Sequence, residues 1–283
     1  MTRMSIALNV AVFVVQIGLT GGKAIGHLPE EEALSFGASY SLAVLGERRW
    51  ETLVTACFLH DGLLHIGFNM LALWMAGPIV ERAVGSARMA PLYLVAGAFG
   101  NLLSVAHSSI VGSAQLTVGA SGAISGVIAA ALVLGWRTQG WRGPLTQAMG
   151  RWLLFVFVFG LMSRFGGGNV DNAAHFGGAL AGATIAFTWR RGRSFSRRAT
   201  SIAVGSCTAV LAACVAIVGV HDRYDRFATM TLQEREVFAS EALSEGRCDD
   251  AIAGLNAAQR LQANVAPLTS LRKRVDETCA REE

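Results

Sequence analysis

Three polar stretches within otherwise apolar sequence decide the fold of this chain: FLHDGLLHIGFNM at residues 58–70, VGASGAISG at 118–126 and VDNAAHFGGALAG at 170–182. Each lies within or opens an apolar run of about 20 residues, the length that a helix needs to cross a bilayer. Polar and ionisable groups are costly inside a membrane, so they indicate a functional site. We therefore expect the three stretches to converge within a bundle of membrane helices.

The composition agrees with a membrane protein. Of 283 residues, 52% are hydrophobic and 16% charged, whereas soluble domains carry roughly 25% charged residues. The sequence has no basic face with interleaved aromatic residues, the pattern that would predict nucleic-acid binding. The five cysteines, at positions 57, 207, 214, 248 and 279, form no CxxC pair and no zinc-ligand spacing, so we expect no metal site.

Seven stretches are long and apolar enough to span a membrane. They cover residues 4–22, 52–79, 89–107, 118–136, 147–163, 171–189 and 199–220. The first carries Arg3 but no clear cleavage site behind it, so we interpret it as an uncleaved span. The sequence predicts an all-α membrane protein in which only the loop at 23–51 is long.

The positive charges predict the orientation. With the N-terminus in the cytoplasm, the inside segments hold eleven arginines and the outside loops up to residue 171 hold four Lys or Arg residues. The inside set is Arg3, Arg82, Arg88, Arg137, Arg142, Arg151, Arg190, Arg191, Arg193, Arg197 and Arg198, and the outside set is Lys23, Arg48, Arg49 and Arg164. Because cytoplasmic loops carry the excess, we expect the N-terminus inside and residues 221–283 outside.

The tail at 221–283 is polar and helix-forming, with small and apolar residues at helical spacing around Gly246. It faintly resembles one tetratricopeptide unit, but a repeat array needs about three copies, so we expect a small capping hairpin. Helices at about 249–263 and 267–281, folded around a turn near Asn264 to Pro267, would bring Cys248 and Cys279 to within about 6 Å along the helix axis. That is at the edge of disulfide reach, and two unpaired surface cysteines remain the alternative.

Ser121 and His175 are the candidate nucleophile and base. A serine hydroxyl becomes nucleophilic when a neighbouring base takes its proton, and histidine is suited to this near neutral pH. Both residues lie near the start of spans that run in the same direction, because two crossings separate them. They can therefore lie at one depth, with Gly119 and Gly122 allowing a sharp bend at the nucleophile.

Other residues in the three stretches complete this hypothesis. Gly177, Gly178 and Gly182 would let the sixth span approach the fourth closely. Asn69 and His65 lie four residues apart on one helix face, at the outer end of a span that also runs inward. With the backbone N–H groups at Gly119 and Ser121, they can supply donors for an oxyanion.

Each feature by itself has a simpler interpretation. The stretch around GASGAISG is typical of close helix packing, a lone histidine can relay protons or pack as a polar group, and Asn69 can join two helices by a hydrogen bond. Together, in this order and at matching depth, the features favour catalysis.

The set FLHxxxxHxxxN, GASG and AHFGG, on the second, fourth and sixth spans, resembles the rhomboid family of intramembrane serine proteases over most of residues 1–190. The resemblance implies that Ser121 is the nucleophile and His175 the base, and that His65 and Asn69 serve the oxyanion. His60 matches the other histidine of the same helix. The sixth-span pattern of the family is matched by Asp171, Gly178 and Gly182. No cofactor is required.

The resemblance also implies the architecture. We expect a six-helix rhomboid-like catalytic core at 1–190, a basic loop and seventh transmembrane helix at 191–220, and a small helical extramembrane tail at 221–283. A seventh span after the six-helix core is similar to a known rhomboid variant.

Two positions depart from the family pattern. The family commonly has Trp-Arg in the first loop, where this chain has Trp50-Glu51 preceded by two arginines. It often has a Tyr four residues after the serine, where this chain has Ser125, so we expect either that His175 is held less rigidly or that another ring, such as Phe176 or Phe68, covers it.

By resemblance, the expected function is cleavage of transmembrane protein substrates near the outer boundary of a bacterial-type plasma membrane. The alternatives are a catalytically inactive rhomboid-like factor that binds or escorts membrane proteins, and a small transporter or channel, which would predict broken helices or inverted repeats. The dyad lacks an obvious orienting carboxylate. Asp171 lies one turn before His175, and we favour a structural role for it.

Overall fold

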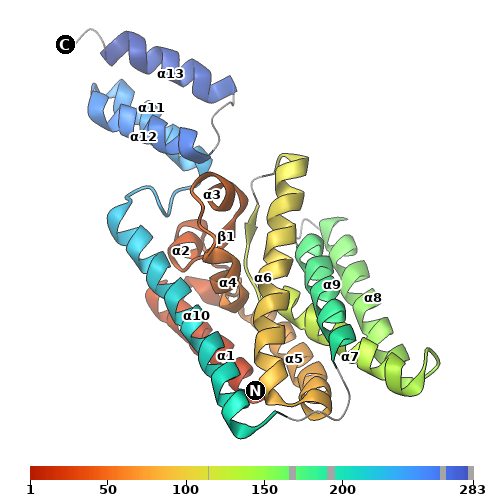
Figure 1. Ribbon diagram of the computed structural model, residues 1–283. Coiled ribbons are helices and arrows are strands. Elements are labelled where there is room, and N and C mark those ends of the chain that lie inside the picture. The colour runs from red at the N-terminus through yellow and green to blue at the C-terminus, as the bar shows by residue number, and fades with distance from the viewer. Residues whose placement is uncertain (114, 166–169, 190–194, 262–265, 280–283) are drawn as a thin grey trace.

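Long apolar helices make up most of the chain, shown as a computed structural model in Figure 1. It describes residues 1–283 except 114, 166–169, 190–194, 262–265 and 280–283. The elements before the second span are α1 (Thr2–Leu19), η1 (Lys23–Ile25), α2 (Glu30–Ser35), β1 (Ser39–Tyr40), α3 (Ser41–Gly46), α4 (Thr52–Thr55) and η2 (Ala56–Phe58). They are followed by α5 (Leu63–Val84), α6 (Ser86–Val111), β2 (Leu116–Thr117), α7 (Ser121–Gln139), α8 (Pro144–Phe165), α9 (Asn172–Thr188), α10 (Arg197–Tyr224), α11 (Leu232–Ser244), α12 (Cys248–Leu261) and α13 (Ala266–Cys279).

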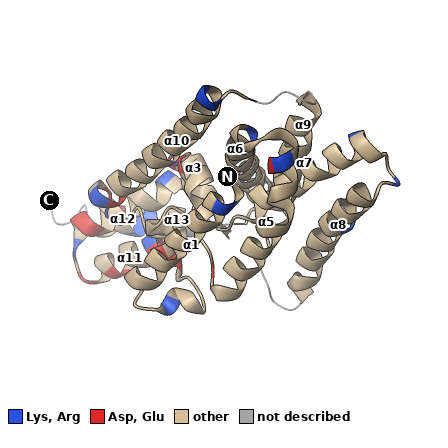
Figure 2. Ribbon diagram, turned by 90° about the horizontal axis from the view of Figure 1, so that it is seen from below, with Lys and Arg blue, Asp and Glu red and all other residues tan. Residues whose placement is uncertain are grey.

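The expected all-α membrane architecture is confirmed. Six described helices are long and apolar enough to cross a membrane, namely α1, α5, α6, α7, α8 and α10. The remaining expected span is α9, whose 17 residues reach about 26 Å at 1.5 Å per residue. Figure 2 shows these long helices almost free of charged residues, which gather at their ends and around the tail. The chain is therefore an integral, multi-pass membrane protein.

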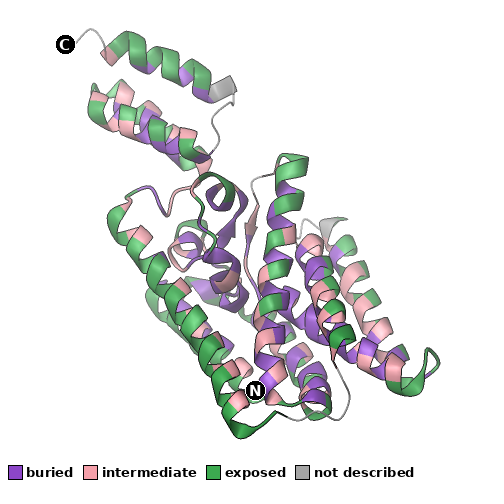
Figure 3. Cartoon of the chain, in the orientation of Figure 1, coloured by how far each residue is buried: buried purple, intermediate pink, exposed green. Residues whose placement is uncertain are grey.

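Helices α6, α7 and α9 form the tightly packed centre of the bundle. A Cβ atom added at Gly178 would overlap the carbonyl oxygen of Gly122, and one at Gly182 would overlap that of Gly126. The two helix backbones are thus in direct contact, as small residues permit. Figure 3 shows α7 largely buried, whereas the outer face of α10 is exposed.

Helices α7 and α9 run in parallel and begin and end at the same levels. At their starts, Thr117 Oγ1 donates to Asp171 Oδ2 over 2.9 Å. At their ends, Arg137 Nη1 donates to the carbonyl oxygen of Trp189 over 2.7 Å. The expectation that these spans start at one depth is confirmed.

The second span is shorter at its start than the sequence suggests. We expected a helix from residue 52, but α4 and η2 are separate short helices, and α5 begins only at Leu63. The chain is extended at Leu59, and Gly62 has φ 92° and ψ 164°, so the helix cannot run through. His60 consequently lies in the connecting segment and not in the helix of His65.

The long first loop carries structure of its own. Its strand β1 pairs antiparallel with β2, with Ser39 opposite Thr117 and Tyr40 opposite Leu116. The pairing joins the first loop to the segment just before α7, which neither sequence stretch by itself predicts.

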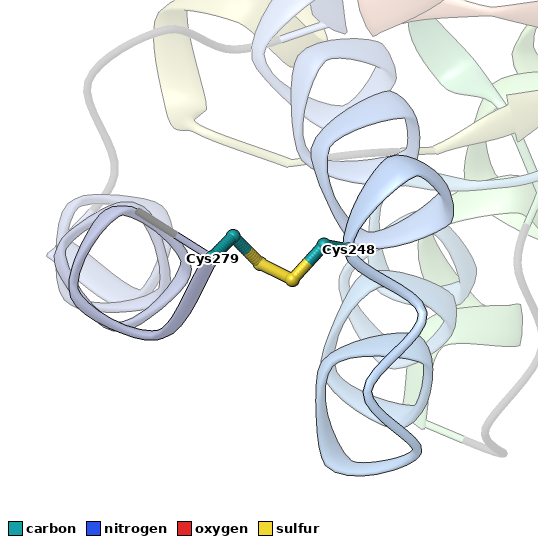
Figure 4. The surroundings of a disulfide bond; sticks show 2 residues. All are labelled: Cys248 and Cys279. Carbon is teal, nitrogen blue, oxygen red and sulfur yellow. A yellow bond between two sulfur atoms is a disulfide. The ribbon is translucent and has the colours of Figure 1, made fainter. Parts of the chain in front are cut away.

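The described part of the tail contains three helices. The hairpin expected around Gly246 corresponds to α11 and α12, and the pair expected at about 249–263 and 267–281 corresponds to α12 and α13. The predicted disulfide is present: Cys248 and Cys279 are bonded with a Cα–Cα distance of 5.6 Å (Figure 4). The expected turn at Asn264 lies outside the described residues, as do Arg190, Arg191 and Arg193 of the predicted basic loop.

Candidate active site

Ser121 is the first residue of α7, and the backbone just before it is held in an unusual conformation. Gly119 has φ +126°, a region that favours glycine, and its N–H donates to the carbonyl oxygen of Ala56 over 2.9 Å. A Cβ atom at Gly119 would lie 2.8 Å from Nε2 of His65 and 3.8 Å from Oγ of Ser121. The glycine therefore lets the His65 ring approach the serine. Gly122, by contrast, lies within α7, and its role is helix packing, not the bend that we expected.

His175 lies in the first turn of α9 and is 5% exposed. A Cβ atom at Gly122 would be 3.3 Å from the carbonyl oxygen of Ala174. The residue after Ser121 thus contacts the residue before His175. Within the described part of the chain, Nδ1 of His175 is buried without a hydrogen-bond partner. The helix contact brings together the two chain segments that carry Ser121 and His175.

Asp171 caps α9 and fastens its start to two other elements. Its Oδ1 accepts a hydrogen bond from the backbone N–H of Ala174 at 2.9 Å, as an N-cap residue does. Its Oδ2 accepts from the hydroxyls of Thr117, at 2.9 Å, and of Ser104. None of these bonds goes to His175, which agrees with the structural role that we favoured.

His65 and Asn69 lie on one face of α5, as expected. Nδ1 of His65 accepts from the backbone N–H of Asp61 at 3.2 Å, so the neutral ring carries its proton on Nε2, the nitrogen beside Gly119. Nδ2 of Asn69 donates one hydrogen to the carbonyl oxygen of His65 at 3.0 Å. An amide nitrogen has two hydrogens, which leaves Asn69 a second one to donate.

His60 packs against His65 in the interior of the bundle. It is fully buried, and its ring meets the His65 ring edge-on, with centroids 5.3 Å apart. Gln16 of α1 holds the His60 backbone on both sides: Oε1 accepts from the N–H at 3.1 Å, and Nε2 donates to the carbonyl oxygen at 3.3 Å. Sequence reasoning missed Gln16, although a buried amide in an apolar span is itself a signal.

The structure shows the surroundings of the two positions that depart from the family pattern, Glu51 and Ser125. Glu51 and Arg49 turn toward α10 and the tail, where Glu51 lies 3.0 Å from Nδ1 of His221. Phe176 and Phe68 are 56% and 68% exposed, and the Phe176 ring packs edge-on against the Phe157 ring, with centroids 6.4 Å apart. Ser125 is 1% exposed within α7.

Comparison with known sequences identifies the family. A family model described as "Rhomboid domain" matches residues 47–192, just over half of the chain. The chain belongs to the rhomboid family. Every site residue that the sequence predicted lies within this rhomboid domain.

Several rhomboid proteins are similar to this chain. The Rhomboid protease GluP of Bacillus subtilis is 30% identical over 261 residues, which cover 90% of this chain and 46% of GluP. The Rhomboid protease AarA of Providencia stuartii is 28% identical over 212 residues, covering 67% of this chain and 72% of AarA. RHOMBOID-like protein 5 of Arabidopsis thaliana is 35% identical over 142 residues, covering 49% of this chain and 43% of that protein. The chain spans about half the length of GluP and of the Arabidopsis protein. The similarity to GluP extends well beyond the rhomboid domain.

Proposed function

We propose that this protein is an intramembrane serine endopeptidase that uses Ser121 as nucleophile and His175 as base. The observation that carries the proposal is the backbone contact between α7 and α9, in which Gly122 meets Ala174 beside the two residues. The names of GluP and AarA as rhomboid proteases support it. We also propose the division into a catalytic core at 1–190, a basic loop with the seventh helix at 191–220 and a tail at 221–283.

The geometry supports a dyad mechanism. His175 accepts the hydroxyl proton of Ser121, whose Oγ attacks the carbonyl carbon of a peptide bond. The oxyanion that forms can accept hydrogen bonds from Nε2–H of His65, the free amide hydrogen of Asn69 and the Ser121 backbone N–H at the start of α7. His175 then gives its proton to the departing amine, and water repeats the sequence to release the acyl group.

The substrates proposed are transmembrane proteins cut near the outer boundary of the bilayer. The position of Ser121 at the very start of a 19-residue helix supports this proposal, because the end of a spanning helix lies near a membrane surface, which is the outer one in the proposed orientation. Water needed for hydrolysis is available there, whereas it is excluded from the bilayer centre.

The proposed orientation places the N-terminus in the cytoplasm of a bacterial-type cell and the tail outside. The packing supports it, since basic residues gather where α9 ends. The guanidinium of Arg88, from α6, lies 5.9 Å from the ring centre of Trp189, whose carbonyl accepts from Arg137. Helix α10 begins with Arg197 and Arg198, and it must cross before the tail begins.

A fluorophosphonate probe tests the activity. The probe should label the purified chain covalently in detergent, and Ser121→Ala and His175→Ala should abolish both labelling and cleavage of a reporter substrate while helix content stays unchanged. Ser201→Ala, on the exposed surface of α10, is the matched control and should behave as wild type. Cleavage by Ser121→Ala at the wild-type rate would exclude the proposal, and a folded wild type that never labels would favour the inactive rhomboid-like binding factor.

A further inference from the structure

A buried ion pair attaches the tail to the first loop. Arg235 of α11 is 1% exposed, and its Nη1 lies 2.5 Å from Oε1 of Glu47, the residue after α3. Its other N–H groups donate to backbone carbonyls of Phe227, Met230 and Ala257. Because a buried guanidinium is costly unless its donors are paired, Arg235 holds the tail backbone and the loop together.

An apolar cluster joins the same parts and reaches the strand before the nucleophile. We call it the junction cluster: the buried residues Leu34, Tyr40, Ala43 and Leu261, with Leu42, Leu116 and Leu232 packed against them. Leu232 and Leu261 come from the tail and Leu116 from β2, whereas the others belong to the first loop. The backbone N–H of Leu232 also donates to the Tyr40 hydroxyl at 3.3 Å. Figure 1 shows the end of α12 close to α3 at this junction.

The end of α10 is fastened to the same loop. Arg49 is 2% exposed and donates through Nη1 to the carbonyl oxygen of Ala228 at 2.8 Å, while Glu51 contacts His221. These are the two charged residues that flank Trp50, where the family often has Trp-Arg. In this chain they bind the connection between the seventh helix and the tail.

The first loop also contacts the segments that lead into α7 and α9. Tyr40 is paired with Leu116 and Ser39 with Thr117 across the two-stranded sheet. Thr117 donates to Asp171, the cap of the helix that carries His175, and Ser121 follows Thr117 by four residues. A short series of direct contacts therefore runs from the tail, through β1 and β2, to Thr117 and Asp171, which precede Ser121 and His175 by four residues each.

We propose that the tail is an intramolecular brace whose docking on the first loop positions the catalytic dyad, with Arg235 and Tyr40 as positioning residues. The inference rests on the proposed function and assigns a role to residues 221–283. A tyrosine hydroxyl is protonated at neutral pH, and burial raises the pKa of the Tyr40 phenol further above its ordinary value.

Substitution of Gly46 should weaken the docking of the tail without changing Ser121 or His175. Gly46 is the last residue of α3, and a Cβ atom there would overlap the carbonyl oxygen of Arg260 and lie 3.0 Å from Cα of Leu261. Alanine is a better helix former than glycine, so Gly46→Ala should push the tail away without weakening α3. Gly219→Ala in α10 is the matched control, because a Cβ atom there meets nothing within 4 Å. Glu47→Gln is a second, independent variant that leaves the bonds of Arg235 to the tail backbone in place.

The full-length variants are compared by hydrogen–deuterium exchange and by the rate of fluorophosphonate labelling. Gly46→Ala and Glu47→Gln should raise amide exchange in α11 and α12 and also at residues 116–121, and should slow labelling by about tenfold, as small displacements at an active site do. Gly219→Ala should match wild type in every measurement.

Two results would overturn the brace. One is faster exchange in the tail with exchange at 116–121 and labelling unchanged, and the other is a tail that stays protected in both variants. Failure of the proposed function is distinguishable, because a wild type that never labels would refute the hydrolase while exchange at 116–121 still decides whether the tail braces the site.

Discussion

Replacement of Asp171 by Ala should cost about 3 kcal/mol of unfolding free energy. The carboxylate caps α9 through the Ala174 N–H, and losing an N-cap costs about 1 kcal/mol. It also accepts hydrogen bonds from Ser104 and Thr117, whose side chains are 2% and 6% exposed. Without the carboxylate, Ser104 and Thr117 can bond only to each other, over 3.1 Å, so both of their bonds to Asp171 are lost, at about 1 kcal/mol each.

Equilibrium unfolding with SDS in mixed micelles, followed by circular dichroism, measures this loss. Asp171→Asn keeps an oxygen that can cap the helix and accept a hydroxyl, so its loss should be about 1 kcal/mol. Asp249→Ala removes an exposed acid from the first turn of α12 and should stay within about 0.5 kcal/mol of wild type. The fluorophosphonate labelling rate of Asp171→Ala should fall by about tenfold as the start of α9 loosens.

The reasoning would be refuted if Asp171→Ala unfolded within about 0.5 kcal/mol of wild type, the range of an ordinary surface substitution. Another outcome would give Asp171 a role in catalysis. If Asp171→Asn kept its stability but lost labelling as completely as His175→Ala, the negative charge would be acting on the base, and Asp171 would be its orienting partner and not a cap.

Two further predictions concern the oxyanion and the tail. Asn69→Ala should slow turnover by about 100-fold while fluorophosphonate labelling persists at a lower rate; unchanged turnover would assign Asn69 to helix packing. Cys248 and Cys279 should resist a maleimide polymer in intact membranes until a reductant is added, because they are bridged, and the tail should be cut by protease added to the outer side. Labelling of both cysteines without reductant would contradict the bridge in the native membrane, and protection from the protease would reverse the proposed orientation.

The sequence was sufficient for the membrane architecture, because apolar run length and charge distribution are local properties. The spans, their order and the parallel course of the fourth and sixth spans followed from run length and from counting crossings, and they led to the expectation that Ser121 and His175 lie at one depth. Helix rise alone brought Cys248 and Cys279 to the edge of disulfide reach, and the packing of the two helices decided for the bridge over two unpaired cysteines.

Breaks inside apolar sequence were harder to predict. The run from 52 to 79 has the composition of one span, yet α5 starts at Leu63 because the backbone is extended at Leu59 and Gly62 has a positive φ. Hydropathy depends only on residue type and therefore cannot predict these dihedral angles. His60 was therefore assigned to the wrong element, although it still packs against His65.

Only the tertiary structure decided how the tail, the first loop and the dyad are joined. The pairing of Tyr40 with Leu116, the ion pair of Arg235 with Glu47 and the contact of Glu51 with His221 join residues that are 76, 188 and 170 positions apart. No periodicity or motif links such residues, because each contact depends on the packing of whole helices. Local chemistry thus indicated which groups to propose for the site, and the packing of distant segments determined which contacts surround them.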